Sequence, residues 1–212
     1  MPDPAVAPLP PTTVTTVGQG TASGVPDTLR VHVSVRHRSS SVSEALAGCA
    51  SGVEAAGSAA RAFTDADKVA SRGLTVGQWH GDDGRPDGFY AQHALEVVCA
   101  DLDRAGALVT ALADAVGERL RIDHVEMFVD DTALMRVTAR ERAFADARAK
   151  ADELATLAGQ RVRSALTVVE GSGHQPFEGA PRAFAAAAGT SFEPGTSMLG
   201  ATVTVTWLTT SL

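Results

Sequence analysis

The stretch LRVHVSVRH, residues 29–37, alternates apolar and polar side chains. Leu29, Val31, Val33 and Val35 fall on one side of an extended chain, and the residues between them fall on the other. A period of two is typical of a strand with one buried and one exposed face. The sequence therefore predicts a half-buried strand here, and the elements on either side of it indicate the sheet to which it belongs.

The segments that follow this strand indicate an α+β fold. Helical spacing of apolar residues begins after a possible N-cap at Ser41 or Ser43, and the turn GDDGRPDG joins two later strands. The predicted elements are a helix to about residue 62, strands 74–80 and 89–100, a helix 101–116 and a strand 120–130. Their β-α-β-β-α-β order is that of a split βαβ unit, in which two helices cover one face of an antiparallel sheet.

Further elements flank this core on both sides. A Thr/Val-rich strand at residues 12–22 precedes it, and a long helix capped at Asp130, Asp131 or Thr132 and closed by Gly159 follows it. Two last strands are predicted at 162–170 and 200–208, which makes the full order ββαββαβαββ. We expect a flexible Pro-rich tail at 1–11 and a single domain over 12–212, with a long loop at about 171–199.

Composition limits the class of protein. The chain of 212 residues carries a net charge of −7, which argues against a general nucleic-acid surface because phosphate binding needs a positive field. No apolar run is long enough for a transmembrane helix, and the N-terminus lacks the features of a secretory signal. We therefore expect a cytoplasmic protein, or a periplasmic or secreted one if the chain has been shortened at its N-terminus.

The motif Val17-Gly18-Gln19-Gly20 has the glycine spacing of a dinucleotide-binding loop. Ser23 occupies the third glycine position, and a turn and a strand follow instead of the helix that would hold a pyrophosphate. The glycines are interpreted as a bulge or bend in an early strand. The sequence predicts no cofactor.

Histidines and cysteines give no metal-binding spacing. His32 falls on the polar face of its strand, while His93 falls among inward-pointing positions, where a hydrogen-bonded core or interface histidine is expected. Cys49 and Cys99 lack a CxxC partner, so they are interpreted as two buried thiols, with a single disulfide left open. Trp79 and Trp207 are interpreted as core or interface anchors. No catalytic or metal-binding residue is predicted.

The stretch RERAFADARAKADELATLAG, residues 140–159, contains charged residues interspersed with alanines. Apolar residues in steps of three and four predict an inner stripe of the helix: Leu134, Val137, Phe144, Ala147, Ala151, Leu154 and Ala158. Opposite charges four residues apart, such as Asp146 and Lys150, would each stabilise an exposed helix by about 0.2 to 0.5 kcal/mol. The charges are therefore interpreted as a solvated face, and the small alanines indicate close packing.

Four motifs in this order resemble the SIMPL-domain family: the early Val-x-Gly-x-Gly with Pro26-Asp27, DLDRAG at 101–106, the alanine-rich pattern of 139–159, and the closing strand ATVTVTW. The resemblance covers residues 13–208. Bacterial members were catalogued as a domain of unknown function. The resemblance implies that the relatives of this chain include a periplasmic immunogenic protein that forms large ring-like oligomers. They also include a mammalian protein that binds a receptor-associated kinase. The family supplies no catalytic residue.

Two hypotheses of function from different classes follow. The first is a non-enzymatic, self-assembling protein-interaction module in envelope or stress physiology, a homo-oligomer whose first and last Thr/Val strands offer edges for pairing. The second is a small-molecule binding protein or hydrolase with a pocket beneath the 171–199 loop, where His174, Arg182 or a nearby histidine supplies polar groups. A kinase-associated adaptor rests on the family resemblance alone.

Overall fold

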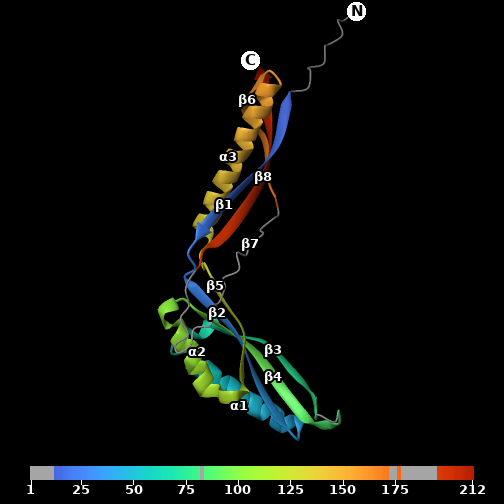
Figure 1. The fold of residues 1–212 in the computed structure, drawn as a ribbon, viewed down its shortest axis with the longest axis vertical. Helices are drawn as coiled ribbons and strands as arrows, with labels where there is room; N and C mark the ends of the chain where they lie inside the picture. The colour runs from blue at the N-terminus through green and yellow to red at the C-terminus, as the bar shows by residue number, and fades with distance from the viewer. Residues whose placement is uncertain (1–11, 82–83, 172–175, 178–194) are drawn as a thin grey trace, which may run out of the picture. The chain divides into compact units, whose positions relative to one another are not determined.

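The computed structural model describes residues 12–81, 84–171, 176–177 and 195–212. These residues form two compact units (Figure 1). One unit contains strands β2 to β5 with helices α1 and α2, and the other contains β1, α3, β6, β7 and β8. The expected single domain over 12–212 stays a prediction. The tail 1–11 and most of the predicted 171–199 loop lie outside the described residues.

The predicted order of helices and strands is confirmed, except that a two-residue strand, β7, is added within the predicted 171–199 loop. The strands are β1 (Thr13–Gly24), β2 (Thr28–Ser39), β3 (Val69–His80), β4 (Pro86–Cys99), β5 (Leu120–Phe128), β6 (Gln160–Glu170), β7 (Pro176–Phe177) and β8 (Ser197–Ser211). The α-helices are α1 (Val42–Ala60), α2 (Leu102–Val116) and α3 (Ala133–Leu157), with short 3-10 turns η1 (Ala66–Lys68) and η2 (Gly117–Arg119). The fold is α+β, with antiparallel pairing in both sheets.

Local capping explains where the helices begin and end. Ser41 is the N-cap of α1, and its hydroxyl accepts a hydrogen bond from the backbone N–H of Glu44 at 3.2 Å. Helix α3 begins after Thr132, while the carboxylate of Asp131 accepts from the N–H of Ala133 at 2.8 Å. Gly159 follows α3 with a φ of 67°, which only glycine adopts without strain. In the described part of the chain, no helix combines the length and apolar character needed to cross a bilayer.

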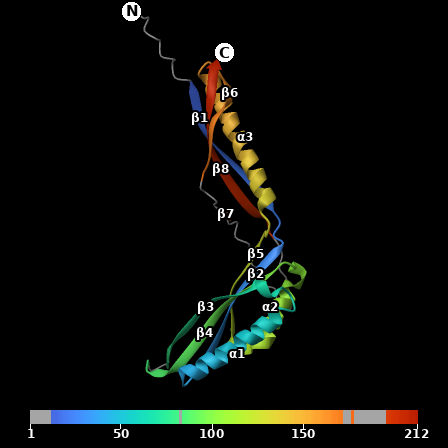
Figure 2. The same cartoon turned by 180° about the vertical axis from the view of Figure 1, so that it is seen from behind.

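The unit built from β2 to β5 has the strand order β3-β4-β2-β5, as a split βαβ unit requires. Figure 2 shows α1 and α2 on one face of this sheet. The four predicted inward side chains of β2, from Leu29 to Val35, are fully buried against these helices. The opposite face carries the polar side chains of β2 and is free of helices among the described residues.

The other unit joins the two ends of the chain in one sheet, with the order β1-β8-β6. Thr13 pairs with Leu208, and the register continues without interruption to Gly24 and Ser197. The last strand, β8, is therefore central, so the expectation that it offers a free edge is wrong. Sequence periodicity cannot show which strands become neighbours when the pairing joins residues almost 200 positions apart. Helix α3 covers one face of the sheet and packs on Val203, Val205 and Trp207.

Candidate functional site

Gly18 and Gly20 of β1 lie directly against the backbone of α3. A Cβ on Gly18 would stand 2.0 Å from the carbonyl oxygen of Ala143. A Cβ on Gly20 would stand 2.2 Å from the carbonyl oxygen of Ala139. Both distances are far below van der Waals contact, so only glycine fits at either position. The interpretation as a bulge or bend is therefore wrong, since the β1–β8 register contains no irregularity, and the glycines instead allow close approach of the helix.

The buried residues of α3 recur at intervals of four, and all of them except Met135 are alanines. They are Met135, Ala139, Ala143, Ala147, Ala151 and Ala155. Of the predicted inner stripe, Ala147 and Ala151 are buried, whereas Leu134, Val137, Phe144 and Leu154 are exposed by 40 to 77%. The prediction is right for Ala147 and Ala151, while Ala158 is exposed. It is wrong for the four large residues because it ranked side chains by hydrophobicity. Where the backbone of the helix lies in contact with the backbone of β1, side-chain size decides which face of the helix packs inward.

Charged side chains of α3 bind the outer edge of β1. Lys150 Nζ donates to the carbonyl oxygen of Val17 at 3.0 Å, and Arg142 Nη1 donates to that of Thr21 at 2.6 Å. Between them, the backbone N–H of Gln19 donates to the carboxylate of Asp146 at 2.8 Å. Four residues of helix rise about 6 Å and two residues of strand about 6.6 Å, so the two ladders stay in step. We call these three side chains the edge clasp.

The edge clasp changes the ionisation of one of its members. Lys150 also donates to Asp146 at 2.6 Å. This hydrogen bond, followed by the one from the Gln19 N–H, holds the pKa of the Asp146 carboxyl below its usual value. The interpretation of these charges as a solvated face alone was therefore incomplete, because three of them satisfy backbone groups of an edge strand.

Strand β6 forms the opposite edge of the same sheet, and its outward side is unpaired among the described residues. Leu166, Val168 and Val169 are exposed by 52, 53 and 60%. An exposed edge strand with large aliphatic side chains is a common site of pairing with another chain. The two edges of this sheet therefore differ, since β1 is clasped and β6 is open.

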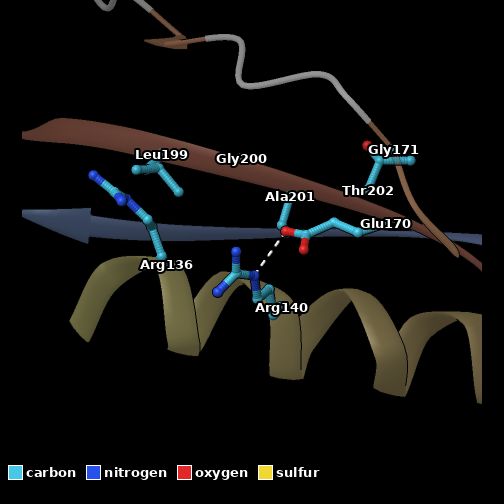
Figure 3. A pocket seen from close by; sticks show the side chains of 8 residues that line it. All are labelled: Arg136, Arg140, Glu170, Gly171, Leu199, Gly200, Ala201 and Thr202. Carbon is cyan, nitrogen blue, oxygen red and sulfur yellow. Dashed lines mark hydrogen bonds and ion pairs between the residues drawn. The ribbon is translucent and has the colours of Figure 1, made fainter. Parts of the chain in front are cut away.

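A shallow hollow lies between α3, β8 and the end of β6 (Figure 3). Residues 199–202 line it together with Gly171. Arg140 Nε donates to the carboxylate of Glu170 at its rim at 2.7 Å. Arg136 also lines the hollow and donates to the hydroxyl of Thr132 at 2.7 Å. The hollow is therefore polar and lined by guanidinium groups.

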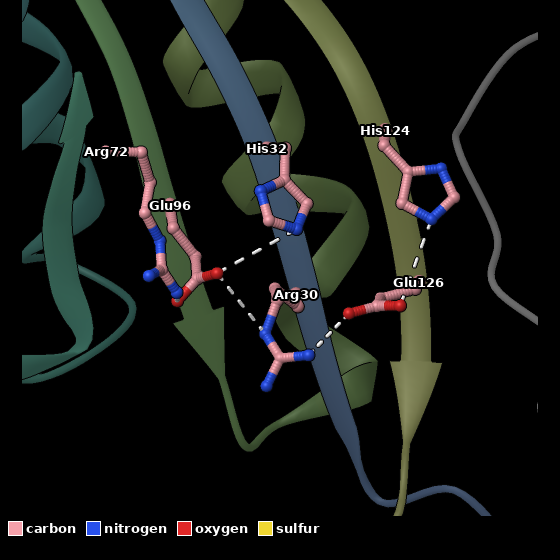
Figure 4. A network of polar contacts seen from close by, with 6 residues as sticks. All are labelled: Arg30, His32, Arg72, Glu96, His124 and Glu126. Atoms are coloured by element: carbon pink, nitrogen blue, oxygen red, sulfur yellow. Dashed lines mark hydrogen bonds and ion pairs between the residues drawn. The ribbon is translucent and has the colours of Figure 1, made fainter. Parts of the chain in front are cut away.

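A network of ion pairs occupies the open face of the four-stranded sheet (Figure 4). Its centre is Glu96 of β4, which is 8% exposed. Arg72 Nη2 lies 2.5 Å from one carboxylate oxygen, while Arg30 Nε and His32 Nε2 lie 3.6 and 3.8 Å from the other. The hydrogen bond from Arg72, opposed by burial, holds the pKa of the Glu96 carboxyl below its usual value. Glu96 is therefore ionised at neutral pH.

The network extends to β5 through Arg30, whose Nη1 donates to Glu126 at 2.5 Å. His32 lies opposite His124 in the β2–β5 register, with the ring centroids 6.1 Å apart. Among the described residues, no group of three or more His, Cys, Asp or Glu side chains is arranged to hold a metal ion. The network is thus an array of cross-strand ion pairs that links all four strands of this sheet, β3, β4, β2 and β5.

The other predicted residues have the following positions. His93 is half-buried and hydrogen-bonds to Ser71 at 2.9 Å, as expected for a satisfied histidine. Cys49 and Cys99 are both buried and free, so the two-thiol interpretation is confirmed. Trp207 is 1% exposed and is a core residue, whereas Trp79 is half-buried under Arg38.

The structure leaves the two predicted pocket residues untested and adds Glu96, which the sequence analysis did not single out. His174 and Arg182 lie outside the described residues, so their role in a pocket stays a prediction. Glu96 was missed by sequence reasoning. Its signal was a lone acidic residue at an outward position of β4, between two buried aliphatic residues and beside a strand with Arg30 and His32 at outward positions.

Comparisons with known proteins agree with the resemblance drawn from the motifs. The model of the SIMPL family, described as a protein of unknown function (DUF541), matches residues 14–207. A search of curated proteins finds no significant match. The matched region runs from the second residue of β1 to Trp207 of β8 and includes both sheets and all three α-helices. The chain therefore belongs to the SIMPL family.

Proposed function

We propose that this protein is a non-enzymatic, self-assembling protein-interaction module, and that a second copy pairs with the open edge of β6. The observation that carries this proposal is the asymmetry between the two edges of the β1-β8-β6 sheet. The edge clasp binds three backbone groups in the middle of β1, whereas β6 exposes its edge and three large aliphatic side chains. Envelope or stress physiology is the proposed setting.

The charge pattern of β6 favours an antiparallel pair of two copies. Arg161 and Arg163 lie near its start and Glu170 at its end. Antiparallel pairing of two β6 strands places the basic end of each beside the acidic end of the other, whereas parallel pairing would place like charges together. A two-fold contact of this kind is self-complementary and closes as a dimer.

The test is the molar mass of the purified protein by size-exclusion chromatography with light scattering. We expect the wild-type protein to form a dimer or larger assembly. The double variant Leu166→Lys/Val168→Lys should be monomeric, because charged side chains on an edge strand oppose pairing. Val17→Lys is the matched control, since Val17 is 49% exposed but belongs to the clasped strand. This variant should keep the wild-type mass.

Two outcomes would contradict the proposal. A wild-type protein that remains monomeric at concentrations of about 100 μM would exclude a stable pair, since such a pair would need a Kd well below that concentration. Equal loss of mass in the β1 and β6 variants would show that lysine destabilises the sheet rather than the contact. Circular dichroism of each variant separates this second outcome from specific dissociation.

The hollow beside α3 supports a second candidate function, the binding of a small anionic molecule. The supporting observation is that Arg136 and Arg140 line a hollow bounded by Gly171 and Leu199, the two ends of the predicted 171–199 loop. In a screen of anionic metabolites, a molecule that binds the hollow should raise the melting temperature of the protein. At a hundredfold excess over its Kd, the bound molecule should stabilise the fold by about 2.7 kcal/mol. Arg140→Gln should abolish the shift, while Arg148→Gln, a substitution on the same helix outside the hollow, should preserve it. Absence of any shift would exclude this candidate.

A further inference from the structure

Two arginines at the end of β2 are stacked on aromatic rings of neighbouring strands. The guanidinium carbon of Arg36 lies 4.0 Å from the ring centroid of Tyr90 on β4. That of Arg38 lies 3.7 Å from the ring of Trp79 on β3. Both arginines belong to the face of the sheet opposite α1 and α2, since they alternate with the buried residues of β2. Stacking fixes the planes of the two guanidinium groups before anything binds.

The position of the Tyr90 ring depends on a glycine. Gly77 pairs with Tyr90 in the β3–β4 register, and a Cβ at position 77 would stand 2.9 Å from the Tyr90 ring. The ring therefore leans over Gly77, across the neighbouring strand. The Trp79 ring is held by its Nε1, which donates to Asp87 at 3.2 Å. Both rings thus have fixed supports within this sheet.

Charge pairing separates these two arginines from the others on the same face. Arg30 pairs with both Glu96 and Glu126, and Arg72 pairs with Glu96. Arg121 pairs with Asp123 at 3.0 Å. For Arg36 and Arg38, no carboxylate among the described residues lies within 4.0 Å.

Two buried polar atoms near these arginines also have no hydrogen-bond partner. They are the Nε of Arg36 and the hydroxyl of Ser34, and Ser34 is 1% exposed. This end of the face therefore holds two positive charges and unused hydrogen-bonding capacity.

We propose that Arg36 and Arg38 bind an extended acidic segment of a partner protein that presents two carboxylates two residues apart. Alternate residues of a strand lie about 6.6 Å apart, and the same spacing separates alternate side chains of an extended peptide. Each planar guanidinium can donate two parallel hydrogen bonds to one carboxylate. Two alternate acidic side chains of an extended peptide therefore supply one carboxylate for each arginine.

A nucleic acid fits this surface less well than an acidic peptide does. A protein that binds a nucleic acid needs many unpaired positive side chains along its surface. The chain as a whole carries a net charge of −7. Among the described residues of this face, Arg36 and Arg38 are two arginines with no carboxylate within 4.0 Å, and the face also contains Glu96, Glu126 and Asp123. These carboxylates would repel further phosphates, whereas a peptide with two acidic residues needs no more than two cations.

The test uses fluorescence anisotropy with the full-length protein and the labelled peptide Gly-Ser-Glu-Ser-Glu-Ser-Gly. We expect saturable binding that weakens about tenfold with Arg36→Gln and again with Arg38→Gln, as the loss of a hydrogen-bonded charge pair predicts. Replacing both glutamates of the peptide by glutamine should abolish binding. Arg121→Gln is the matched control, because it removes a positive charge from the same face but one already paired with Asp123. It should leave the affinity unchanged.

A second variant tests the stacking itself. Tyr90→Leu keeps both charges but removes the ring beneath Arg36, so the affinity for the peptide should fall while circular dichroism stays unchanged. Three outcomes would overturn the proposal. The first is binding that does not saturate up to about 1 mM peptide. The second is tighter binding of a labelled oligothymidine than of the peptide. The third is a change of oligomeric mass in the Arg36→Gln/Arg38→Gln variant, which would make the face a contact between copies.

Discussion

Gly18 of β1 lies so close to Ala147 of α3 that a Cβ on the glycine would stand 2.5 Å from the backbone nitrogen of Ala147 and 2.7 Å from its Cβ. The contact is repeated one step along the strand, where Gly20 lies against Ala143. Thr16 continues the seam at its other end, since its hydroxyl donates to the carbonyl of Ala147 at 2.8 Å and accepts from Trp207 Nε1 at 2.9 Å. The seam therefore joins the first strand, the long helix and the last strand.

Gly18→Ala should destabilise the protein by about 3 kcal/mol, because the new methyl group overlaps backbone atoms that cannot move without shifting the helix. Chemical unfolding in urea measures the change. Gly73→Ala on β3 is the control, since a Cβ there meets nothing within 4 Å. That substitution should change the stability by less than about 0.5 kcal/mol. Equal effects at the two positions would mean that loss of chain flexibility, and not overlap, governs the result.

Ala147→Leu should cost about 1 to 3 kcal/mol, because the larger side chain has no space at a fully buried position of the seam. Ala149→Leu makes the same change on the exposed side of α3, so it should have little effect on the urea midpoint. A neutral Ala147→Leu would place the packing face of the helix elsewhere.

Asp146→Asn should loosen the edge clasp. The backbone N–H of Gln19 loses a charged acceptor, so its hydrogen exchange should accelerate, while residues of β8 keep their protection. Amide exchange followed by NMR detects this directly. If Gln19 exchanged at the wild-type rate in the variant, the carboxylate would not be holding the edge.

The same carboxylate predicts a pH dependence. Its pKa is lower in the folded protein than its usual value of 3.8, so the ionised group stabilises the fold above that value. The stabilisation is lost as the pH falls through the folded-state pKa. Wild-type stability should therefore decline more steeply than that of Asp146→Asn between about pH 4 and pH 2. Parallel curves for the two proteins would contradict this.

Glu96→Gln should destabilise the protein by about 1 to 3 kcal/mol, because it leaves Arg30 and Arg72 without their shared carboxylate at a nearly buried position. Glu126→Gln, whose side chain is 36% exposed, should cost about 0.5 kcal/mol. Thermal unfolding of both variants compares the two. A larger effect at Glu126 would mean that burial does not set the strength of this network.

Much of the fold was predictable from local patterns. The alternation of Leu29 to Val35 predicted a strand with one buried side, and all four aliphatic residues are fully buried. The turn GDDGRPDG predicted the β3–β4 hairpin, in which Gly84 and Gly88 adopt positive φ values. Such patterns succeed because side chains two residues apart in a strand share one face, whatever the remainder of the chain does.

The candidate sites were much less predictable. Arg36 and Tyr90 are 54 positions apart, and Lys150 and Val17 are 133 apart. Nothing in the local spacing of either residue indicates its partner. Glu96 was visible as an acidic residue between two buried aliphatic residues, but its three basic neighbours come from two other strands.

By itself the sequence determined the order of helices and strands, the faces of β2 and the family, because periodicity, turn residues and motif order are properties of short segments. Only the tertiary structure decided that β1 and β8 pair, that β8 is central, and that the alanines rather than the larger apolar residues of α3 face the sheet. The physical reason is that close backbone packing selects small side chains at positions that become neighbours only after folding. Gly18 and Ala147 are 129 residues apart along the chain, and their fit exists only in the folded protein.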